Sequence, residues 1–219
     1  MKGCIILANG YIPMKRDLTY LRNNGYKYFI CADGGADSAK KLNLIPDIII
    51  GDLDSVSEET LSHFQNKGVV VKKIARQNDT DVEKCIKYAI RKKYSEVILL
   101  GATGDRLDHT FCNLGITLKF SDDIAVKILH EKSLMKVIRG KVSFDTMPGE
   151  IISLYGIDSK TKFTSTGLKY PLKNVSLPFG KKESTSNVAL SNKVEIKINY
   201  GQALIVRDFG VIKSNDFIF

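Results

Sequence analysis

Residues 46–55, PDIIIGDLDS, carry the strongest fold signal in this chain. The isoleucine run Ile48–Ile50 has no polar alternation, which is typical of a strand covered on both faces of a parallel sheet. The run leads directly into two aspartates, Asp52 and Asp54, separated by one leucine. In an extended segment, at about 3.3 Å rise per residue, such side chains point the same way with roughly 7 Å between their Cα atoms. We therefore predict a buried strand that presents two carboxylates at its carboxyl end.

The first 130 residues alternate similar apolar runs with helix-like segments. The expected strands are residues 3–8, 26–32, 46–51, 68–74, 95–101 and 123–129. Residues 79–93 repeat apolar side chains at spacings of three and four, which predicts a helix. Strands and helices in strict alternation predict an α/β fold with a doubly wound, mainly parallel sheet. In such a sheet, ligands bind outside the carboxyl ends of the strands.

Two short motifs predict where helices begin. Thr80, followed three residues later by Glu83, matches a capping box at the start of the helix in residues 79–93. Ser55 and Glu58 have the same spacing after the strand that ends near residue 51, and predict a second box.

After about residue 131 the pattern changes to short strands separated by Gly, Pro, Asn and Ser. The expected strands lie within residues 134–144, 151–156, 164–170, 193–200 and 203–209. Val194, Ile196 and Ile198 alternate with polar residues, as in a half-buried antiparallel strand. We predict an α/β domain at residues 1–130 and a smaller antiparallel β-sandwich domain at residues 131–219.

Composition places the chain among globular proteins, with 43% hydrophobic and 26% charged residues. No apolar run approaches the roughly 18 to 20 residues that cross a bilayer. The first apolar run, residues 4–8, is too short for a signal peptide. We therefore expect a cytoplasmic protein without a membrane partner.

The positions of the cysteines and of the basic residues argue against two further kinds of site. The four cysteines lie far apart in apolar runs without a CxxC pair, so we expect buried, reduced thiols rather than a zinc or redox site. The formal net charge of +9 brings nucleic acid into consideration. The basic residues are spread along the chain and lack the interleaved aromatic residues of single-strand binders, so we expect no nucleic-acid partner.

Aspartates follow four of the expected strands at the same edge of the sheet. They are Asp33, Asp52, Asp54, Asp79, Asp81, Asp105 and Asp108. Like charges brought together raise one another's pKa unless a cation compensates. Hard oxygen ligands without His or Cys favour magnesium. Helix caps and first-turn charges are an alternative interpretation for Asp79, Asp105 and Asp108, but a single cap does not need both Asp52 and Asp54.

Two glycine-containing turns suggest a phosphate site. Gly101 and Gly104 follow a strand and precede a helix that we expect to start near Asp105. Backbone N–H groups at a helix N-terminus attract phosphate, and Arg106 adds a fork of donors. Gly34 and Gly35 form a second turn after residues 26–32, although glycines also occur in turns that bind nothing.

These motifs, in their order, resemble the thiamine pyrophosphokinase family. The matching stretches are ADGGA at 32–36, PDIIIGDLDS at 46–55, QNDTD at 77–81, GATGDRLDHT at 101–110 and STSN at 184–187. The resemblance covers nearly the whole chain. It implies an α/β catalytic domain followed by a β-sandwich, a homodimer, and Mg²⁺-dependent transfer of the pyrophosphoryl group of ATP to the hydroxyl of thiamine, with release of AMP.

The resemblance also implies roles for individual residues. Magnesium and the ATP phosphates would be held by Asp52, Asp54 and Asp81. ATP would be lined by Asp33, Gly34, Gly35, Gly101, Thr103, Gly104 and Arg106. Thiamine would be bordered by Gln77 and Asp81, with Ser186 and Asn187 supplied by the partner subunit.

The resemblance implies a catalytic set of Asp52, Asp54, Asp81, Asp108 and Arg106. Asp108 is favoured over Asp81 as the base near the thiamine hydroxyl, because a metal-bound carboxylate is a poorer base. Some family members stack a tryptophan on thiamine just after the Ser-Asn pair, whereas this chain has no Trp, so the stacking residue is not assigned.

Other functions remain open at this stage. The sequence says least about the pocket for the acceptor, so another hydroxymethyl heterocycle, such as a pterin, is an alternative to thiamine. A non-catalytic regulator that binds a nucleotide or thiamine is a further alternative, and a nucleic-acid binder is the least favoured.

Overall fold

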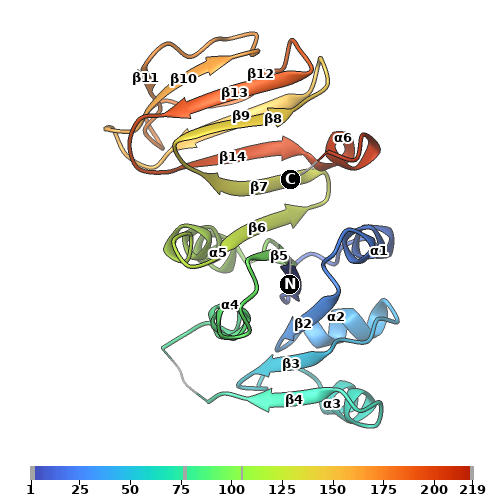
Figure 1. Ribbon diagram of the computed structural model, residues 1–219. Helices are drawn as coiled ribbons and strands as arrows, with labels where there is room; N and C mark the ends of the chain where they lie inside the picture. The colour runs from blue at the N-terminus through green and yellow to red at the C-terminus, as the bar shows by residue number, and fades with distance from the viewer. Residues whose placement is uncertain (1–2, 76–77, 105, 218–219) are drawn as a thin grey trace. The chain divides into compact units, whose positions relative to one another are not determined.

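The computed structural model describes residues 3–75, 78–104 and 106–217. The chain divides into two compact units, Met1–Glu131 and Lys132–Phe219 (Figure 1). The first unit contains a sheet of six strands in the order β6-β5-β1-β2-β3-β4, and every neighbouring pair is parallel. The strands are β1 Gly3–Leu7, β2 Tyr28–Ala32, β3 Ile48–Gly51, β4 Val70–Lys73, β5 Glu96–Leu100 and β6 Ala125–His130.

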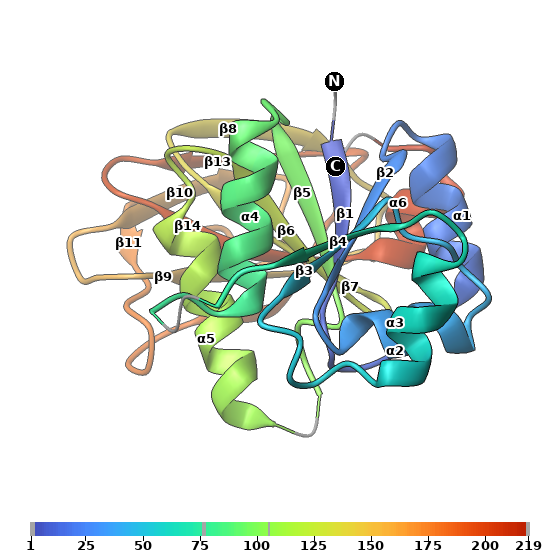
Figure 2. The same cartoon turned by 90° about the horizontal axis from the view of Figure 1, so that it is seen from below.

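Helices cover both faces of this sheet. They are α1 Lys15–Asn23, α2 Gly35–Lys41, α3 Glu58–Gln65, α4 Asp81–Arg91 and α5 Leu107–Lys119. In Figure 2, α4 and α5 lie on one face, and α1, α2 and α3 lie on the other. The central strands are accordingly apolar along their length, with Ile5, Ile30 and Ile98 fully buried. The predicted doubly wound parallel sheet is confirmed.

The strand order creates a switch point between β1 and β5. The chain runs outward from β1 to β2, β3 and β4, and then returns so that β5 pairs with the other side of β1. The helices that follow β1 and β5, which are α1 and α5, lie on opposite faces of the sheet, and this leaves a crevice at its carboxyl edge (Figure 2).

The helix starts agree only in part with the predicted caps. The Thr80 side chain accepts a hydrogen bond from the Glu83 N–H, and the Glu83 carboxylate accepts one from the Thr80 N–H. The predicted capping box of α4 is therefore confirmed. The box predicted at Ser55 is wrong, because the cap of α3 is Ser57, whose Oγ accepts from the Thr60 N–H.

The cysteine prediction needs one correction. Cys4, Cys31 and Cys85 are buried and free, as expected. Cys112 is exposed instead, because it lies on the side of α5 that lines a cleft rather than the core.

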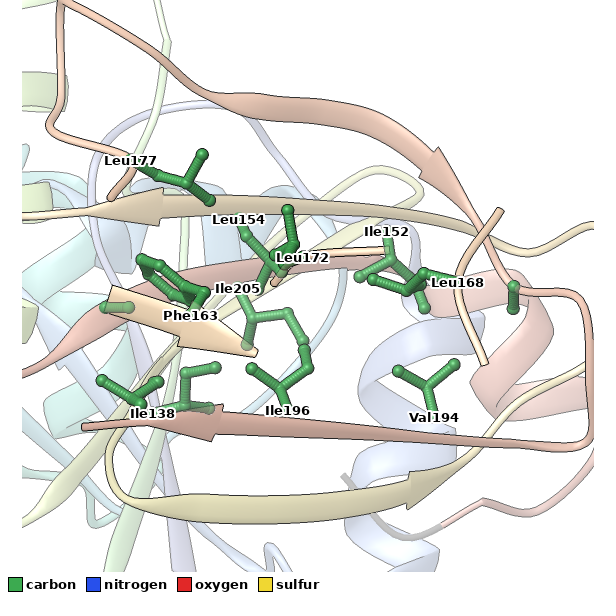
Figure 3. Close-up of a cluster of buried hydrophobic side chains, with 13 residues drawn as sticks. Ile138, Ile152, Leu154, Phe163, Leu168, Leu172, Leu177, Val194, Ile196 and Ile205 are labelled. Atoms are coloured by element: carbon green, nitrogen blue, oxygen red, sulfur yellow. The ribbon is translucent and has the colours of Figure 1, made fainter. Parts of the chain in front are cut away.

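The second unit contains two antiparallel layers. One has the order β12-β9-β14-β7 and the other β11-β10-β13-β8. The strands are β7 Ser133–Ile138, β8 Lys141–Asp145, β9 Ile151–Gly156, β10 Lys162–Thr166, β11 Val175–Ser176, β12 Ser184–Val188, β13 Lys193–Ile198 and β14 Ala203–Asp208, followed by helix α6 Phe209–Ser214. Both layers contribute to one apolar core, shown in Figure 3, in which Leu154, Phe163 and Ile196 are fully buried. The predicted antiparallel sandwich is confirmed.

Glycines end two of the expected strands early. Gly140, at φ +60°, separates β7 from β8, so the run predicted at 134–144 supplies one strand to each layer. Gly167, at φ +82°, ends β10 at Thr166 within the run predicted at 164–170. None of the helices in the described parts of the chain has the length and apolar character that a membrane crossing requires.

Candidate active site

A cleft of about 740 Å³ opens at the carboxyl edge of the first unit's sheet. Residues from the segments after β1, β2, β3, β4 and β5 line it, and it includes the switch point between β1 and β5. Among the residues predicted for the site, the cleft brings together Asp33, Gly34, Asp52, Asp81, Gly101, Thr103, Gly104, Arg106 and Asp108. Gln77 and Asp105 lie outside the described residues.

Three carboxylates meet at the floor of this cleft. Asp33 follows β2, Asp52 follows β3, and Asp81 is the first residue of α4. One ligand oxygen from each residue lies within 4.8 Å of the other two. Parallel strands end at the same edge, so their following residues converge although they are far apart in sequence. We call Asp33, Asp52 and Asp81 the acid cluster.

Asp33 is held in the acid cluster by its backbone. It is 2% exposed and adopts φ +42°, a left-handed conformation that few non-glycine residues take. Its Oδ1 accepts the Val56 N–H at 3.0 Å. A Cβ atom on Gly51 would lie 2.7 Å from the Asp33 Cβ, so the close approach of β2 and β3 depends on glycine there.

Asp54 does not join the acid cluster. The predicted extended geometry of residues 52–54 is wrong, because Leu53 adopts φ +68° and turns the chain. Asp54 is exposed and accepts a hydrogen bond from the Ser55 Oγ at 3.0 Å. The third carboxylate of the acid cluster is that of Asp33.

Lys84 is the main functional candidate that sequence reasoning missed. It is 3% exposed, and its Nζ lies 2.8 Å from Asp81 Oδ1 and 3.4 Å from Asp52 Oδ2. Residues three apart share one face of a helix. The spacing from Asp81 to Lys84, on a helix that starts at the carboxyl edge of the sheet, was the signal that could have revealed it.

Burial and charge set the ionisation of the acid cluster. Burial raises the pKa of Asp33 to about 6, and the Asp81 carboxylate adds to this, while the N–H groups of Val56 and Ser55 oppose it. Burial also acts to raise the pKa of Asp52, but the Lys84 ammonium outweighs it and the pKa is lowered. Asp33 therefore holds a proton more readily than Asp52 when no further cation is bound.

The acid cluster fits a divalent cation. Among the residues that the structure describes, Asp52 Oδ1 is buried without a hydrogen-bond partner, and an unsatisfied buried carboxylate oxygen is costly. Within the same described residues, three carboxylates face one ammonium, which leaves negative charge uncompensated. Carboxylate oxygens are the ligands that Mg²⁺ prefers.

The glycine turn beside the acid cluster is tightly built. The Gly10 N–H donates to Gly101 O at 2.9 Å, and the Tyr11 N–H donates to Thr103 O at 2.6 Å. Gly101 has φ +62°, and a Cβ there would lie 2.3 Å from Ala8 O. This wall of the cleft therefore exposes backbone rather than side chains, which suits a phosphate chain.

The two glycines after β2 play different parts. Gly34 lines the cleft. Gly35 is not among the lining residues; it opens α2, where an added Cβ would lie 2.1 Å from Leu7 O. Gly35 therefore serves the packing of α2 against β1.

Arg106 and Asp108 form an exposed pair at the mouth of the cleft. Arg106 precedes α5, and its Nε and Nη2 donate to the Asp108 carboxylate at 3.2 and 2.5 Å. The Arg106 hydrogen bond lowers the pKa of Asp108 to about 2. A carboxylate with so low a pKa is a weak proton acceptor near neutral pH.

Ser186 and Asn187, predicted for a thiamine site, lie in the second unit and differ from each other. Asn187 is 1% exposed, and its amide binds the Tyr170 N–H, the Tyr170 carbonyl and Ser184 Oγ. This side chain shapes the irregular strand β12. Ser186 is exposed, with φ +55°, so its side chain is available to a ligand.

An aromatic pair accompanies Ser186 on the second unit. The rings of Tyr155 and Phe179 meet edge to face at 6.2 Å between centroids, and Phe179 is 61% exposed. The Tyr155 hydroxyl accepts from Thr185 Oγ1 at 3.4 Å. Exposed aromatic faces attract organic cations.

Two family models match the chain in the order of its two units. Residues 20–128 match "Thiamin pyrophosphokinase, catalytic domain", and residues 140–203 match "Thiamin pyrophosphokinase, vitamin B1 binding domain". Together these matches cover well over half of the sequence.

Individual relatives and solved structures agree with the family models. Thiamine pyrophosphokinase 3 of Oryza sativa subsp. japonica is 31% identical over 211 residues, covering 80% of this chain and 76% of the relative. Thiamin pyrophosphokinase 1 of Caenorhabditis elegans is 28% identical over 189 residues, covering 80% and 76%. The fold is similar to the crystal structure of thiamine pyrophosphokinase from Bacillus subtilis, with a TM-score of 0.83, 22% identity, and coverage of 94% of this chain and 99% of that one. The chain belongs to the thiamine pyrophosphokinase family.

Proposed function

We propose that this protein is an ATP- and Mg²⁺-dependent thiamine pyrophosphokinase that converts thiamine to thiamine diphosphate and releases AMP. The observation that carries the proposal is the acid cluster at the carboxyl edge of a sheet that matches the family's catalytic domain, with Asp52 Oδ1 unpartnered among the described residues. Carboxylates that can bind a cation, next to the exposed backbone of a glycine turn, are suited to a metal-bound nucleotide.

Asp52, Asp81 and Asp33 are the residues we assign to Mg²⁺. Asp54, at the exposed rim next to Asp52, is placed to meet metal-bound water or a phosphate oxygen. Bound Mg²⁺ would neutralise the charge on the phosphate oxygens during transfer. Phosphoryl-type transfer needs positioning and charge compensation more than a protein nucleophile.

The reaction moves one group and one proton. The thiamine hydroxyl oxygen forms a bond to the β-phosphorus of ATP, the bond between that phosphorus and the α–β bridging oxygen breaks, and AMP leaves. The hydroxyl proton passes to a nearby base or to water. The backbone wall at Gly101–Gly104 and the Arg106 fork would hold the phosphates in line for this displacement.

We propose that thiamine binds at the exposed side of β12. We also assign Gln77 to thiamine, because the family resemblance implies it. Ser186 and Thr185 offer hydroxyl groups, and the Tyr155–Phe179 pair offers an aromatic face for the cationic ring. We propose that the enzyme is a homodimer in which the partner subunit supplies Ser186. ATP as co-substrate favours a cytoplasmic location.

An assay with purified protein, Mg²⁺, ATP and thiamine tests the proposal. We expect equal amounts of AMP and thiamine diphosphate, and neither product in EDTA or with Asp52→Asn. ATP consumption that yields ADP, or no turnover with thiamine, would contradict it.

Two acceptor controls separate the alternatives. A hydroxymethylpterin offered beside thiamine should not compete as a substrate if thiamine is the acceptor. Saturable binding of ATP or thiamine without AMP release would instead favour a non-catalytic regulator.

A further inference from the structure

Lys84 is a buried cation for which the proposed reaction assigns no part. Its side chain is 2% exposed, whereas Lys87, one turn further along α4, is 35% exposed and pairs with Asp79 at 2.6 Å. Lysine normally keeps its ammonium group in water. Burial of this ammonium is therefore compensated by its contacts with Asp81 and Asp52.

Lys84 contacts some carboxylate oxygens of the acid cluster and leaves others free. Its Nζ contacts Oδ1 of Asp81 and Oδ2 of Asp52, while Oδ1 of Asp52 is buried and has no partner in the described parts of the chain. The ammonium therefore fixes the rotation of the Asp52 carboxylate and leaves one oxygen free for a ligand. Because α4 packs against β2 and β3, Lys84 is held beside the two aspartates at the wall of the cleft.

We infer that Lys84 is a positioning residue that holds Asp52 and Asp81 in their ligand-binding geometry before the metal and nucleotide arrive. The inference rests on the proposed function, since it assumes that these carboxylates bind Mg²⁺. Lys84 acts through the two aspartates and balances one of the three negative charges of the acid cluster.

Removal of this charge has two opposite consequences for a metal. The carboxylates lose orientation, which weakens binding, but the acid cluster becomes more negative, which strengthens it. At equal distance a divalent ion interacts with a unit charge twice as strongly as a monovalent ion does. We expect the charge effect to exceed the loss of orientation for Mg²⁺ alone, and the loss of orientation to dominate in catalysis.

Lys84→Met keeps the length of the side chain and removes its charge. Lys127→Met is the matched control, because Lys127 is also buried, 5% exposed, and pairs with Glu96 at the opposite end of β5 from the cleft. Thermal unfolding is measured without nucleotide, in EDTA and in Mg²⁺, at matched ionic strength.

Both variants should melt below the wild type in EDTA. The rise in melting temperature on adding Mg²⁺ should be at least about twofold larger for Lys84→Met than for the wild type, and unchanged for Lys127→Met. With ATP and thiamine, kcat of Lys84→Met should fall about 10- to 100-fold while KM for thiamine stays within about twofold. Lys84→Gln replaces Lys84→Met in both measurements if the methionine variant does not fold.

The outcomes separate this inference from the proposed function. An Mg²⁺-induced rise equal to that of the wild type, or an unchanged kcat, overturns the role of Lys84 while the enzyme assignment stands. A rise smaller than that of the wild type supports positioning and shows that the loss of orientation exceeds the charge effect. A wild type that shows neither an Mg²⁺-induced rise nor product formation overturns the metal site, and the role of Lys84 with it.

Discussion

Charged side chains are buried in both units of the chain, but in opposite states of balance. In the second unit, Arg207 donates two hydrogen bonds to Glu150, at 2.7 and 2.9 Å, and a third to the Asp145 carbonyl at 2.7 Å. One cation meets one anion, and both are almost fully buried. In the acid cluster of the first unit, three carboxylates share the ammonium of Lys84, and Asp52 Oδ1 has no partner among the residues described by the structure.

This difference distinguishes a structural charge pair from a ligand site. A buried ion pair in which one cation balances one anion needs no further ligand, and its removal lowers only the stability of the fold. An unbalanced cluster at a cleft is incomplete until a ligand supplies the missing charge. Removing a charge from the acid cluster should therefore leave the stability of the fold unchanged but abolish activity. Removing a charge from the Arg207–Glu150 pair should lower stability without a direct effect on the chemistry.

The largest effect is expected from Asp52→Asn. The substitution keeps the shape of the side chain but removes one ligand charge, so product formation should fall by at least about 10³-fold. The melting temperature in EDTA should stay the same or rise, because one of three repelling charges is gone. Product release and thermal unfolding on the same preparation measure both effects; a variant that melts well below the wild type would place Asp52 with the structural charges.

Arg207→Met should have the opposite profile. It leaves Glu150 buried without its partner, which should cost about 3 to 5 kcal/mol in the free energy of unfolding. Mg²⁺ should not restore the loss. Urea denaturation measures it, and Arg207→Met combined with Glu150→Leu should recover much of the stability. Recovery by Mg²⁺ in the single variant would break the distinction between the two regions.

The pH dependence of metal-free stability sharpens the comparison through Asp33. Its pKa is raised to about 6, so the folded chain binds this proton more tightly than the unfolded chain. The resulting stabilisation is fully present below about pH 4 and is lost as pH rises through about 6, by at most about 3 kcal/mol. Asp33→Asn removes this dependence.

The wild type and Asp33→Asn are compared by urea denaturation in EDTA between about pH 4 and pH 8. The free energy of unfolding of the wild type minus that of the variant should decrease with pH, and Mg²⁺ at the upper end should reverse the decrease. Parallel curves would show that neither burial nor the neighbouring carboxylates raise the pKa of Asp33.

Asn187, like Arg207, is buried and forms hydrogen bonds within the protein, although its motif predicted a residue that binds thiamine. Asn187→Ala leaves the Tyr170 N–H and carbonyl without their partner and should cost about 1 to 3 kcal/mol. Ser186→Ala should change stability by less than about 0.5 kcal/mol and raise KM for thiamine. Equal stability of the two variants would assign Asn187 to the ligand instead.

The smallest effect is expected at the exposed pair. Asp108 has a pKa of about 2 beside Arg106, so it contributes little as a base. Asp108→Asn should lower kcat by less than about tenfold and leave the pH profile of kcat in place. Loss of the ascending limb of that profile would restore Asp108 as the proton acceptor.

The fold was readable from local patterns because each one has a single physical cause. Uninterrupted apolar runs such as Ile48–Ile50 require cover on both faces, and the alternation at Val194–Ile198 requires cover on one. The convergence of Asp33, Asp52 and Asp81 followed from the parallel sheet alone.

The details of the site depend on tertiary contacts that no local pattern carries. The left-handed conformation of Leu53, which turns the chain between Asp52 and Asp54, occurs at a residue with no preference for it. The burial of Lys84 depends on the packing of α4 against the sheet, and the structural role of Asn187 depends on Tyr170, a residue 17 positions away.

The most direct test of the central claim is calorimetric binding of α,β-methylene-ATP, which cannot be cleaved at the bond broken in pyrophosphoryl transfer. The account predicts binding in Mg²⁺ that weakens at least about tenfold in EDTA and about as much in Asp52→Asn. Equal affinity under all three conditions would show that the acid cluster does not hold a metal-bound nucleotide.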